Sequence, residues 1–144
     1  VGAVREPVVN FIVKTYEGFK RVLFSGDSLT EIDHVYAFAE VPEGFVETQR
    51  ISNKEMNLVR YENGETGAVI VMSQSITTDY SFSLDSENGE IKTFDTNGKE
   101  VKIYCAESQT LYSAFWVEDT YIMELTYSGE TDTDELLRLI NTIK

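Results

Sequence analysis

The stretch IKTFDTNGKEVKIYCA, residues 91–106, contains two runs of β-forming residues on either side of an Asn-Gly pair. Asn97 and Gly98 are the residues that two-residue hairpin turns favour, because both central positions of a type I′ turn need a positive φ. The segment therefore predicts a β-hairpin whose strands are Ile91–Asp95 and Val101–Ala106.

Further extended segments lie on both sides of this hairpin. Toward the C terminus, Leu111–Glu118 and Tyr121–Tyr127 are separated only by Asp119-Thr120. Toward the N terminus, turn residues such as Val41-Pro42-Glu43-Gly44 and Glu62-Asn63-Gly64-Glu65 separate four more candidates, which are His34–Phe38, Phe45–Ile51, Met56–Tyr61 and Gly67–Ser75. Such short connections leave no room for parallel crossovers, so we expect an antiparallel sheet of about seven or eight strands.

Helices are predicted at the two ends of the chain. In 5–24 the apolar residues recur at helical steps, at Val8, Ile12, Tyr16, Phe19 and Leu23, with Pro7 in the first turn. In 132–143 they form one stripe, at Leu136, Leu137, Leu139, Ile140 and Ile143, after the capping and first-turn residues Thr131, Asp132, Asp134 and Glu135. The expected fold class is α+β, a curved antiparallel sheet with an N-terminal and a C-terminal helix packed on one face.

Length and composition exclude several classes of protein. With 144 residues, of which 42% are hydrophobic, residues 1–144 fit a single domain with one core. The net charge of -13 repels phosphates, which excludes a general nucleic-acid or anionic-membrane binder. One cysteine cannot form an internal disulfide, and no segment is apolar enough to cross a membrane. Because the chain opens at Val1 without a methionine, we expect an upstream segment to be missing.

The candidates for catalysis and for metal binding have simpler structural explanations. His34 and Cys105 could form a base and nucleophile pair, but a partly buried histidine and a core thiol are the favoured interpretation. The acidic cluster 85–90 does not match the spacing of a calcium-binding loop, and the cluster 130–135 is explained by helix capping. The sequence therefore predicts no catalytic, cofactor-binding or metal-binding residue.

Aromatic residues are concentrated in the last two predicted strands. They alternate along these strands, so some should face the core and others the opposite face of the sheet. Exposed aromatic rings anchor peptides, glycans and partner chains. The residues considered for such a binding surface are Tyr112, Trp116, Tyr121 and Tyr127.

Several segments together resemble the bacterial domain of unknown function 4367 family. The first set is Val41-Pro42-Glu43-Gly44-Phe45, Val59-Arg60-Tyr61-Glu62-Asn63 and Val69-Ile70-Val71-Met72-Ser73-Gln74. The second set is Ala114-Phe115-Trp116, Tyr121, Leu125, Gly129 and Asp134-Glu135-Leu136-Leu137, and residues 3–11 are also similar. The chain departs from the family pattern at Phe45, where tyrosine is usual.

The resemblance implies a non-enzymatic extracytoplasmic domain of a single-span, membrane-anchored bacterial protein, tethered through a helix upstream of Val1. Relatives of this arrangement are described as sensors or as anti-sigma-factor-like, so a protein or cell-wall partner and regulation of a cytoplasmic factor are expected. The family supplies no catalytic residue. Two alternatives remain open, a cell-wall-directed hydrolase and a half-barrel that binds a small ligand or lipid, and the oligomeric state is also open.

Overall fold

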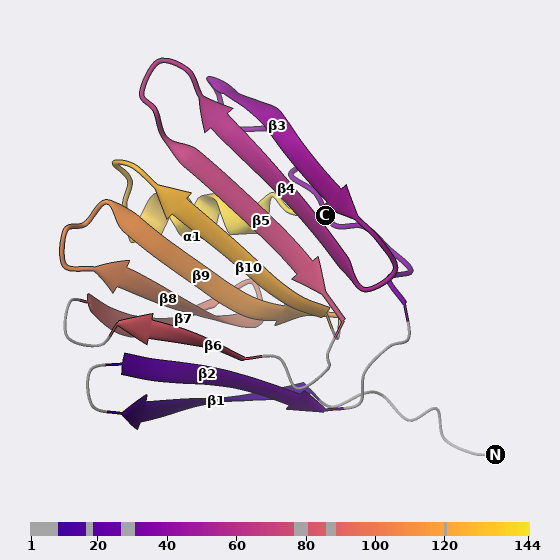
Figure 1. Ribbon diagram of the computed structural model, residues 1–144, viewed down its shortest axis with the longest axis vertical. Helices are drawn as coiled ribbons and strands as arrows, with labels where there is room; N and C mark the ends of the chain where they lie inside the picture. Colours follow the sequence, from indigo (N-terminus) through magenta and orange to yellow (C-terminus); the bar gives the residue numbers. More distant parts are fainter. Residues whose placement is uncertain (1–8, 17–18, 27–30, 77–80, 86–88, 120) are drawn as a thin grey trace.

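The residues that the structure describes fold into two antiparallel sheets and one helix. The structure is a computed structural model that describes residues 9–16, 19–26, 31–76, 81–85, 89–119 and 121–144. Its larger sheet has the strand order β3-β4-β5-β10-β9-β8-β7 (Figure 1). The bounds of these strands are Phe45–Ser52 (β3), Met56–Asn63 (β4), Val69–Ser75 (β5), Gly89–Thr96 (β7), Lys99–Ala106 (β8), Leu111–Glu118 (β9) and Tyr121–Ser128 (β10).

The seven-stranded sheet confirms the hairpins that the sequence predicts. In the central hairpin Thr96 of β7 lies opposite Lys99 of β8, and the two residues between them, Asn97 and Gly98, have φ values of 48° and 77°. Positive φ at both positions is the backbone geometry of a type I′ turn. The local turn chemistry therefore fixes the register of these two strands.

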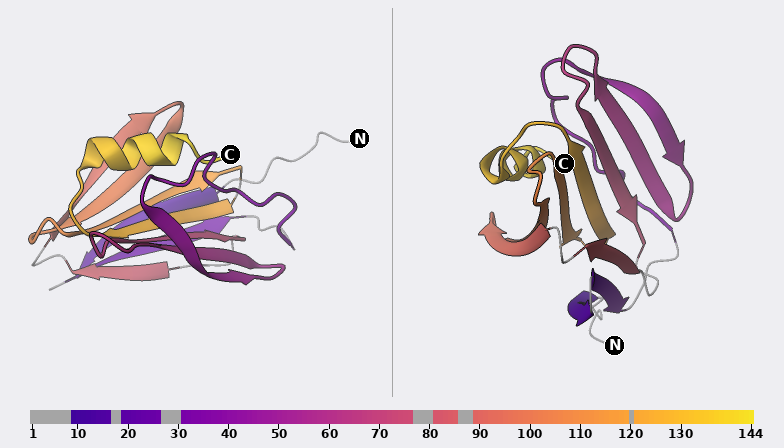
Figure 2. Two further views of the ribbon diagram at one scale, coloured as in Figure 1. Left: turned by 90° about the horizontal axis from the view of Figure 1, so that it is seen from above. Right: turned by 60° about the vertical axis from the view of Figure 1, so that its left-hand side comes forward.

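The helix α1, Thr133–Asn141, lies on the concave face of the large sheet (Figure 2). The carboxylate of Asp132 accepts a hydrogen bond of 2.8 Å from the backbone N–H of Glu135, which is the predicted N-cap. The predicted apolar stripe packs into the core against residues of β4, β5, β8, β9 and β10. Leu136, Leu139, Ile140 and Ile143 are buried, and Leu137 is partly buried at the edge of the core. The C-terminal helix and its buried face are confirmed.

The predicted N-terminal helix is not confirmed. Residues of that segment instead form strands β1, Val9–Tyr16, and β2, Phe19–Gly26, which pair antiparallel with Tyr16 opposite Phe19. A third strand, β6 at Ser81–Asp85, pairs with β2 and completes a small sheet on the side of the molecule away from α1 (Figure 2). The parts of the helix prediction at 5–8 and 17–18, Pro7 included, lie outside the described residues.

The physical reason is that this segment carries two periodicities. Its apolar residues can be counted at helical steps, but Val9, Phe11 and Val13 also alternate with Asn10, Ile12 and Lys14 as strand residues do. β-branched and aromatic side chains lose rotamer freedom in a helix and are favoured in sheets. Pairing with β6, which is distant in the sequence, adds a tertiary preference that a local pattern does not contain.

The predicted strand at His34–Phe38 is also absent. Phe38 forms only an isolated β-bridge with Ile143, and the surrounding segment hydrogen-bonds to the end of the chain. The backbone N–H of Ala37 donates to the carbonyl of Lys144 at 3.1 Å, and the N–H of Lys144 donates to the carbonyl of Ala37 at 2.9 Å. This segment therefore joins the C terminus to the edge half of the sheet instead of adding a strand.

Candidate functional site

The four aromatic residues predicted as a possible binding surface are buried. Tyr112, Trp116, Tyr121 and Tyr127 have exposed fractions of 5%, 0%, 2% and 9%, and all four belong to the core beneath α1. The prediction that these rings are exposed is wrong because the pairing of β9 with β10 places them on the core face. Because Glu118 pairs with Tyr121, even-numbered residues of β9 and odd-numbered residues of β10 point to the same face. The structure therefore offers no exposed surface made of these rings.

The register also separates His34 from Cys105. The carbonyl oxygen of His34 accepts a hydrogen bond of 2.7 Å from the side chain of Gln74 on β5, at the level of Trp116 in β9. Cys105 lies on β8 opposite Tyr112, four residues further along the sheet and three strands away from β5. At about 3.3 Å per residue and about 4.8 Å per strand, Cys105 lies roughly 19 Å from Gln74, the residue to which His34 is hydrogen-bonded. The structure does not bring these residues together as a base and nucleophile.

Neither acidic cluster forms a metal site in the part of the chain that the structure describes. No group of three or more His, Cys, Asp or Glu side chains with metal-binding geometry occurs among the described residues. Asp132 caps α1, as predicted for the cluster 130–135. Positions 86–88 of the other cluster lie outside the described residues.

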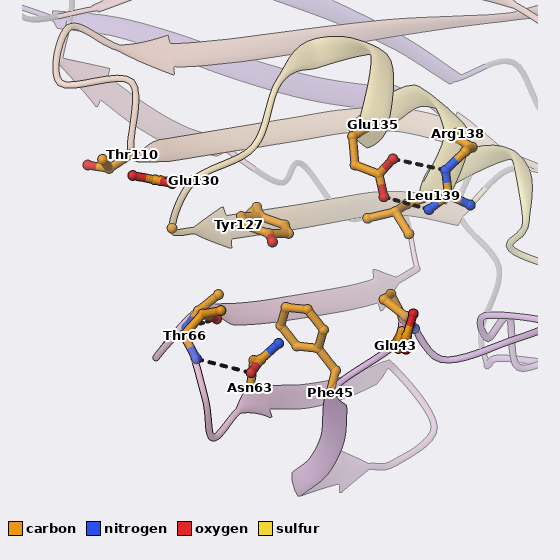
Figure 3. A pocket seen from close by; sticks show the side chains of 13 residues that line it. Glu43, Phe45, Asn63, Thr66, Thr110, Tyr127, Glu130, Glu135, Arg138 and Leu139 are labelled. Carbon is orange, nitrogen blue, oxygen red and sulfur yellow. Dashed lines mark hydrogen bonds and ion pairs between the residues drawn. The ribbon is translucent and has the colours of Figure 1, made fainter.

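A cleft of about 750 Å³ opens at one end of the large sheet, between the β3–β5 strands and α1. We call it the α1 cleft. Figure 3 shows its lining side chains, which come from segments far apart in the sequence. These residues are Pro42, Glu43, Phe45, Asn63, Thr66, Ala68, Thr110, Tyr127, Gly129, Glu130, Glu135, Arg138 and Leu139. The cleft is therefore a product of the tertiary fold.

One wall of the α1 cleft is a turn held by Asn63. Its side-chain oxygen accepts hydrogen bonds from the backbone N–H groups of Glu65 and Thr66, at 2.9 and 3.1 Å. Gly44 has a φ of 87°, and a Cβ atom there would lie 2.7 Å from the side-chain nitrogen of Asn63. Glycine at this position thus supplies both the backbone conformation and the room for the Asn63 amide.

The apolar part of the cleft is formed by two rings and a close backbone approach. The rings of Phe45 and Tyr127 meet edge to face with centroids 6.1 Å apart and planes at 66° (Figure 3). Gly129 has a φ of 139°, and a Cβ atom there would lie 2.9 Å from the Cβ of Ala68. The small residues keep the ends of β5 and β10 close together and leave the rings in contact with the cleft.

Carboxylates surround the apolar part. Glu43 and Glu130 are exposed residues, whereas Glu135 binds the guanidinium of Arg138 with a bond of 2.9 Å from Nε (Figure 3). The hydrogen bond from Arg138 lowers the pKa of Glu135 below its usual value. Burial raises the pKa of Tyr127, and the nearby charge of Glu135 adds to this effect. With three carboxylates and one guanidinium, the α1 cleft has an excess of negative charge.

Of the four aromatic residues predicted as a binding surface, only Tyr127 lines the α1 cleft. Pro42, Glu43 and Phe45 belong to one of the segments that resemble the family, and Asn63 belongs to another. Gly129 and Glu135 belong to the C-terminal set. Locally these segments indicate turns, a strand start and a helix cap, and only the pairing of β5 with β10 shows that they line one cleft. The signal was the occurrence of separate motifs rich in turn residues.

Comparison with known proteins places the chain in a family. No described helix is long and apolar enough to span a membrane. No curated protein and no solved structure gave a match to the chain. The family model for "Domain of unknown function (DUF4367)" matches residues 35–143, which contain the large sheet, α1 and every residue of the α1 cleft. The chain therefore belongs to the DUF4367 family.

Proposed function

We propose that this protein is a non-enzymatic sensor or partner-binding domain and that the α1 cleft is its binding site. The observation that carries the proposal is the convergence of separate family motifs on one cleft. Pro42-Glu43-Gly44-Phe45, Asn63, Gly129 and Glu135 come from different parts of the chain, and all of them contact or line this cleft. Ligand sites are typically concave, with apolar side chains and a few oriented polar groups.

The chemistry of the cleft favours a ligand with an apolar group next to a positive charge. The half-buried Phe45 ring, which packs edge to face on the buried Tyr127, offers an apolar surface, and an aromatic face attracts a cation. Glu43 and Glu130 add negative charge at the surface, while the charge of Arg138 is compensated by Glu135. A short basic segment of a protein partner, or a cell-wall fragment with a free amino group, fits this combination.

In this proposal the domain lies on the extracytoplasmic face of the membrane, held by a single span upstream of the domain, and a bound partner affects a cytoplasmic factor. The support is the family resemblance together with an acidic chain of net charge -13, which is repelled by anionic lipid headgroups. Protease accessibility of a C-terminal tag on intact cells that make the full-length protein tests this location. A tag that is protected until the cells are lysed would contradict it.

The binding proposal can be tested with a panel of short labelled peptides and soluble cell-wall peptides that differ in charge and in aromatic content. We expect measurable affinity for basic, apolar members and none for acidic ones. The double variant Glu43→Gln/Glu130→Gln should weaken binding about three- to tenfold, because two long-range attractions are lost. Glu55→Gln/Glu107→Gln removes the same charge at exposed positions outside the cleft lining and serves as the matched control. Equal weakening by both double variants would contradict a site in the cleft.

The hydrolase alternative has a separate test. The purified domain is assayed with peptidase, glycosidase, esterase and phosphatase substrates, together with His34→Ala and Cys105→Ala variants. We expect no turnover. Turnover that disappears in one variant while the fold is retained would replace the binding proposal. The half-barrel alternative is not favoured, because side chains such as Trp116 and Leu136 fill the space between the sheet and α1.

A further inference from the structure

Strand β3 is a free edge of the seven-stranded sheet. Among the described residues it pairs with β4 on one side only, and Figure 1 shows its other side at the margin of the molecule. Residues 46–52 are all exposed, and they include two of the most exposed large apolar side chains among the described residues, Val46 at 63% and Ile51 at 42%. An edge of this length presents unpaired backbone N–H and C=O groups that can add another strand.

A β-bulge at Thr48 sorts the side chains of β3 between the two faces of the sheet. Glu47 lies opposite Tyr61 and Arg50 lies opposite Val59, and both partners are core residues on the concave face. Glu47 and Arg50 therefore share that face, where they form an ion pair. Without the bulge, residues three apart in a strand would point to opposite faces.

On the other face of β3, Val46 and Ile51 are also placed on either side of the bulge. Val46 lies opposite Glu62 and Ile51 lies opposite Leu58, positions that alternate with the core-facing positions of β4. Val46 and Ile51 thus both point to the convex face. The centre of β3, between Thr48 and Gln49, has the same number of residues on each side, so each face carries a matched pair at equal distances from the centre.

We propose that β3 is a homodimer interface, at which β3 of a second copy pairs antiparallel about a two-fold axis between Thr48 and Gln49. In this register Glu47 of each copy lies opposite Arg50 of the second copy, and Val46 lies opposite Ile51 of the second copy. Residues directly opposite each other must point to the same face, and the bulge satisfies this condition for both pairs. Charge and apolar complementarity of β3 with itself select a second copy as the partner.

The opposite edge of the sheet lacks the bulge that gives β3 a matched pair of different residues on each face. The pairing of β7 with β8 is uninterrupted, so β7 has no bulge. A symmetric pairing of β7 must then place one residue opposite itself. Centred on Lys92 it opposes two ammonium groups, and centred on Thr93 it places Ile91 opposite Asp95 of the second copy. Only a register centred on Ile91, near the start of the strand, matches charges, with Glu90 opposite Lys92 of the second copy. Edge strands commonly carry bulges and charges that block pairing, but on β3 these features match in the dimer.

Two charge-reversal variants test the register. Glu47→Arg makes both positions basic, and Arg50→Glu makes both positions acidic. Each variant alone places like charges opposite each other and should dimerise at least about tenfold more weakly than the natural chain. A one-to-one mixture restores opposite charges at both contacts between copies while the contact within each chain stays repulsive. We expect the mixture to form a heterodimer in sedimentation velocity experiments on the purified 144-residue chain.

Controls keep this result specific to β3. Glu107→Arg changes the charge by the same amount at an exposed position outside β3 and should leave dimerisation unchanged. Circular dichroism and thermal unfolding check that each variant is folded. A natural chain that stays monomeric up to millimolar concentration, or a dimer that both reversals leave intact, would overturn the proposal.

A cross-linking experiment gives a second readout. In a Cys105→Ser background, Val46→Cys/Ile51→Cys should form disulfide-linked dimers on mild oxidation, because the two positions lie opposite each other across the interface. The two cysteines of one chain are five residues apart on an extended strand, about 16 Å, which is too far for a disulfide within the chain. Val46→Cys alone should cross-link much less. Equal cross-linking of the single and double variants would indicate random collision and contradict the proposal. Pairing of β3 with an extended peptide, without any dimer of the domain, would also contradict it.

Discussion

Two parts of the same sheet differ in how they use their apolar residues. In the half formed by β8, β9, β10 and α1, side chains such as Trp116, Leu125 and Leu136 have exposed fractions of 0%. In β3, at the edge of the other half, Val46 and Ile51 remain in contact with solvent. Both regions alternate in sequence as strands do. Burial is therefore determined by the position of a strand in the sheet order, and the comparison separates residues that stabilise the domain from residues available for contacts.

The largest expected effect comes from the core half. Leu136→Ala should destabilise the domain by about 2 to 5 kcal/mol, since it removes a buried side chain and leaves a cavity between α1 and the sheet. Val46→Ala, the matched change on β3, should alter the free energy of unfolding by less than about 0.5 kcal/mol. Urea unfolding of the two variants, measured at a concentration where the protein is monomeric, checks this difference. Similar losses in both would remove the distinction between the halves.

The next effect concerns the glycines at the ends of the strands. Gly129→Ala should cost about 1 to 3 kcal/mol, because φ is 139° and the new Cβ would lie 2.9 Å from the Cβ of Ala68. Gly64→Ala, in the turn between β4 and β5, meets nothing within 4 Å and should have little effect. Thermal unfolding of both variants gives the comparison. A large loss for Gly64→Ala alone would show that the edge half carries more of the stability than we infer.

A smaller effect is expected at the start of α1. Asp132→Ala removes the side chain that accepts from the backbone N–H of Glu135, and should destabilise the domain by about 1 kcal/mol. Asp132→Asn keeps an N-cap acceptor and should recover most of that loss. The measurement is the midpoint of urea unfolding for the two variants. If both variants were as stable as the natural chain, packing of the helix on the sheet would suffice without the cap.

The smallest effect should appear at alkaline pH in both halves. Burial raises the pKa of Tyr61 on β4 and of Tyr127 on β10 above the ordinary value of 10.0. A pKa that is higher in the folded state means that the unfolded state loses its proton first. The resulting stability is fully present below pH 10 and declines as the pH rises through the folded-state values. Tyr61→Phe and Tyr127→Phe should each flatten this decline in urea unfolding between neutral and strongly alkaline pH, and an unchanged decline in both variants would contradict the assignment.

Much of the fold could be predicted because its signals are local. The Asn97-Gly98 pair fixes a turn, and Asp132 with the stripe of α1 fixes a helix, without reference to distant residues. Local signals do not decide between helix and strand in the N-terminal segment, because Val9, Phe11 and Val13 fit a strand pattern inside a segment that also fits a helix pattern. Its pairing with β6 involves a part of the chain that a local window does not contain.

The site could not be predicted for a related reason. The alternation of aromatic residues indicates two faces for each strand separately. Only the pairing of Glu118 with Tyr121 shows which face of β9 is continuous with which face of β10. The α1 cleft depends on residues still further apart in the sequence. Asn63 and Tyr127 line the same cleft only because β10 pairs with β5. Turn motifs show where the chain reverses direction, but they do not show which reversals become neighbours.

The position of β10 has a consequence for how the protein is made. β10 is the last strand in the sequence and lies in the middle of the sheet, between β5 and β9. The β3-β4-β5 unit and the β7-β8-β9 unit precede β10 in the chain, and neither can bury its inner edge until β10 is available. Pairings between distant segments slow folding and expose unpaired strands to aggregation in the meantime. The domain should therefore be prone to aggregation until residues 121–128 are available, and only a chain that contains β10 should fold in one cooperative step.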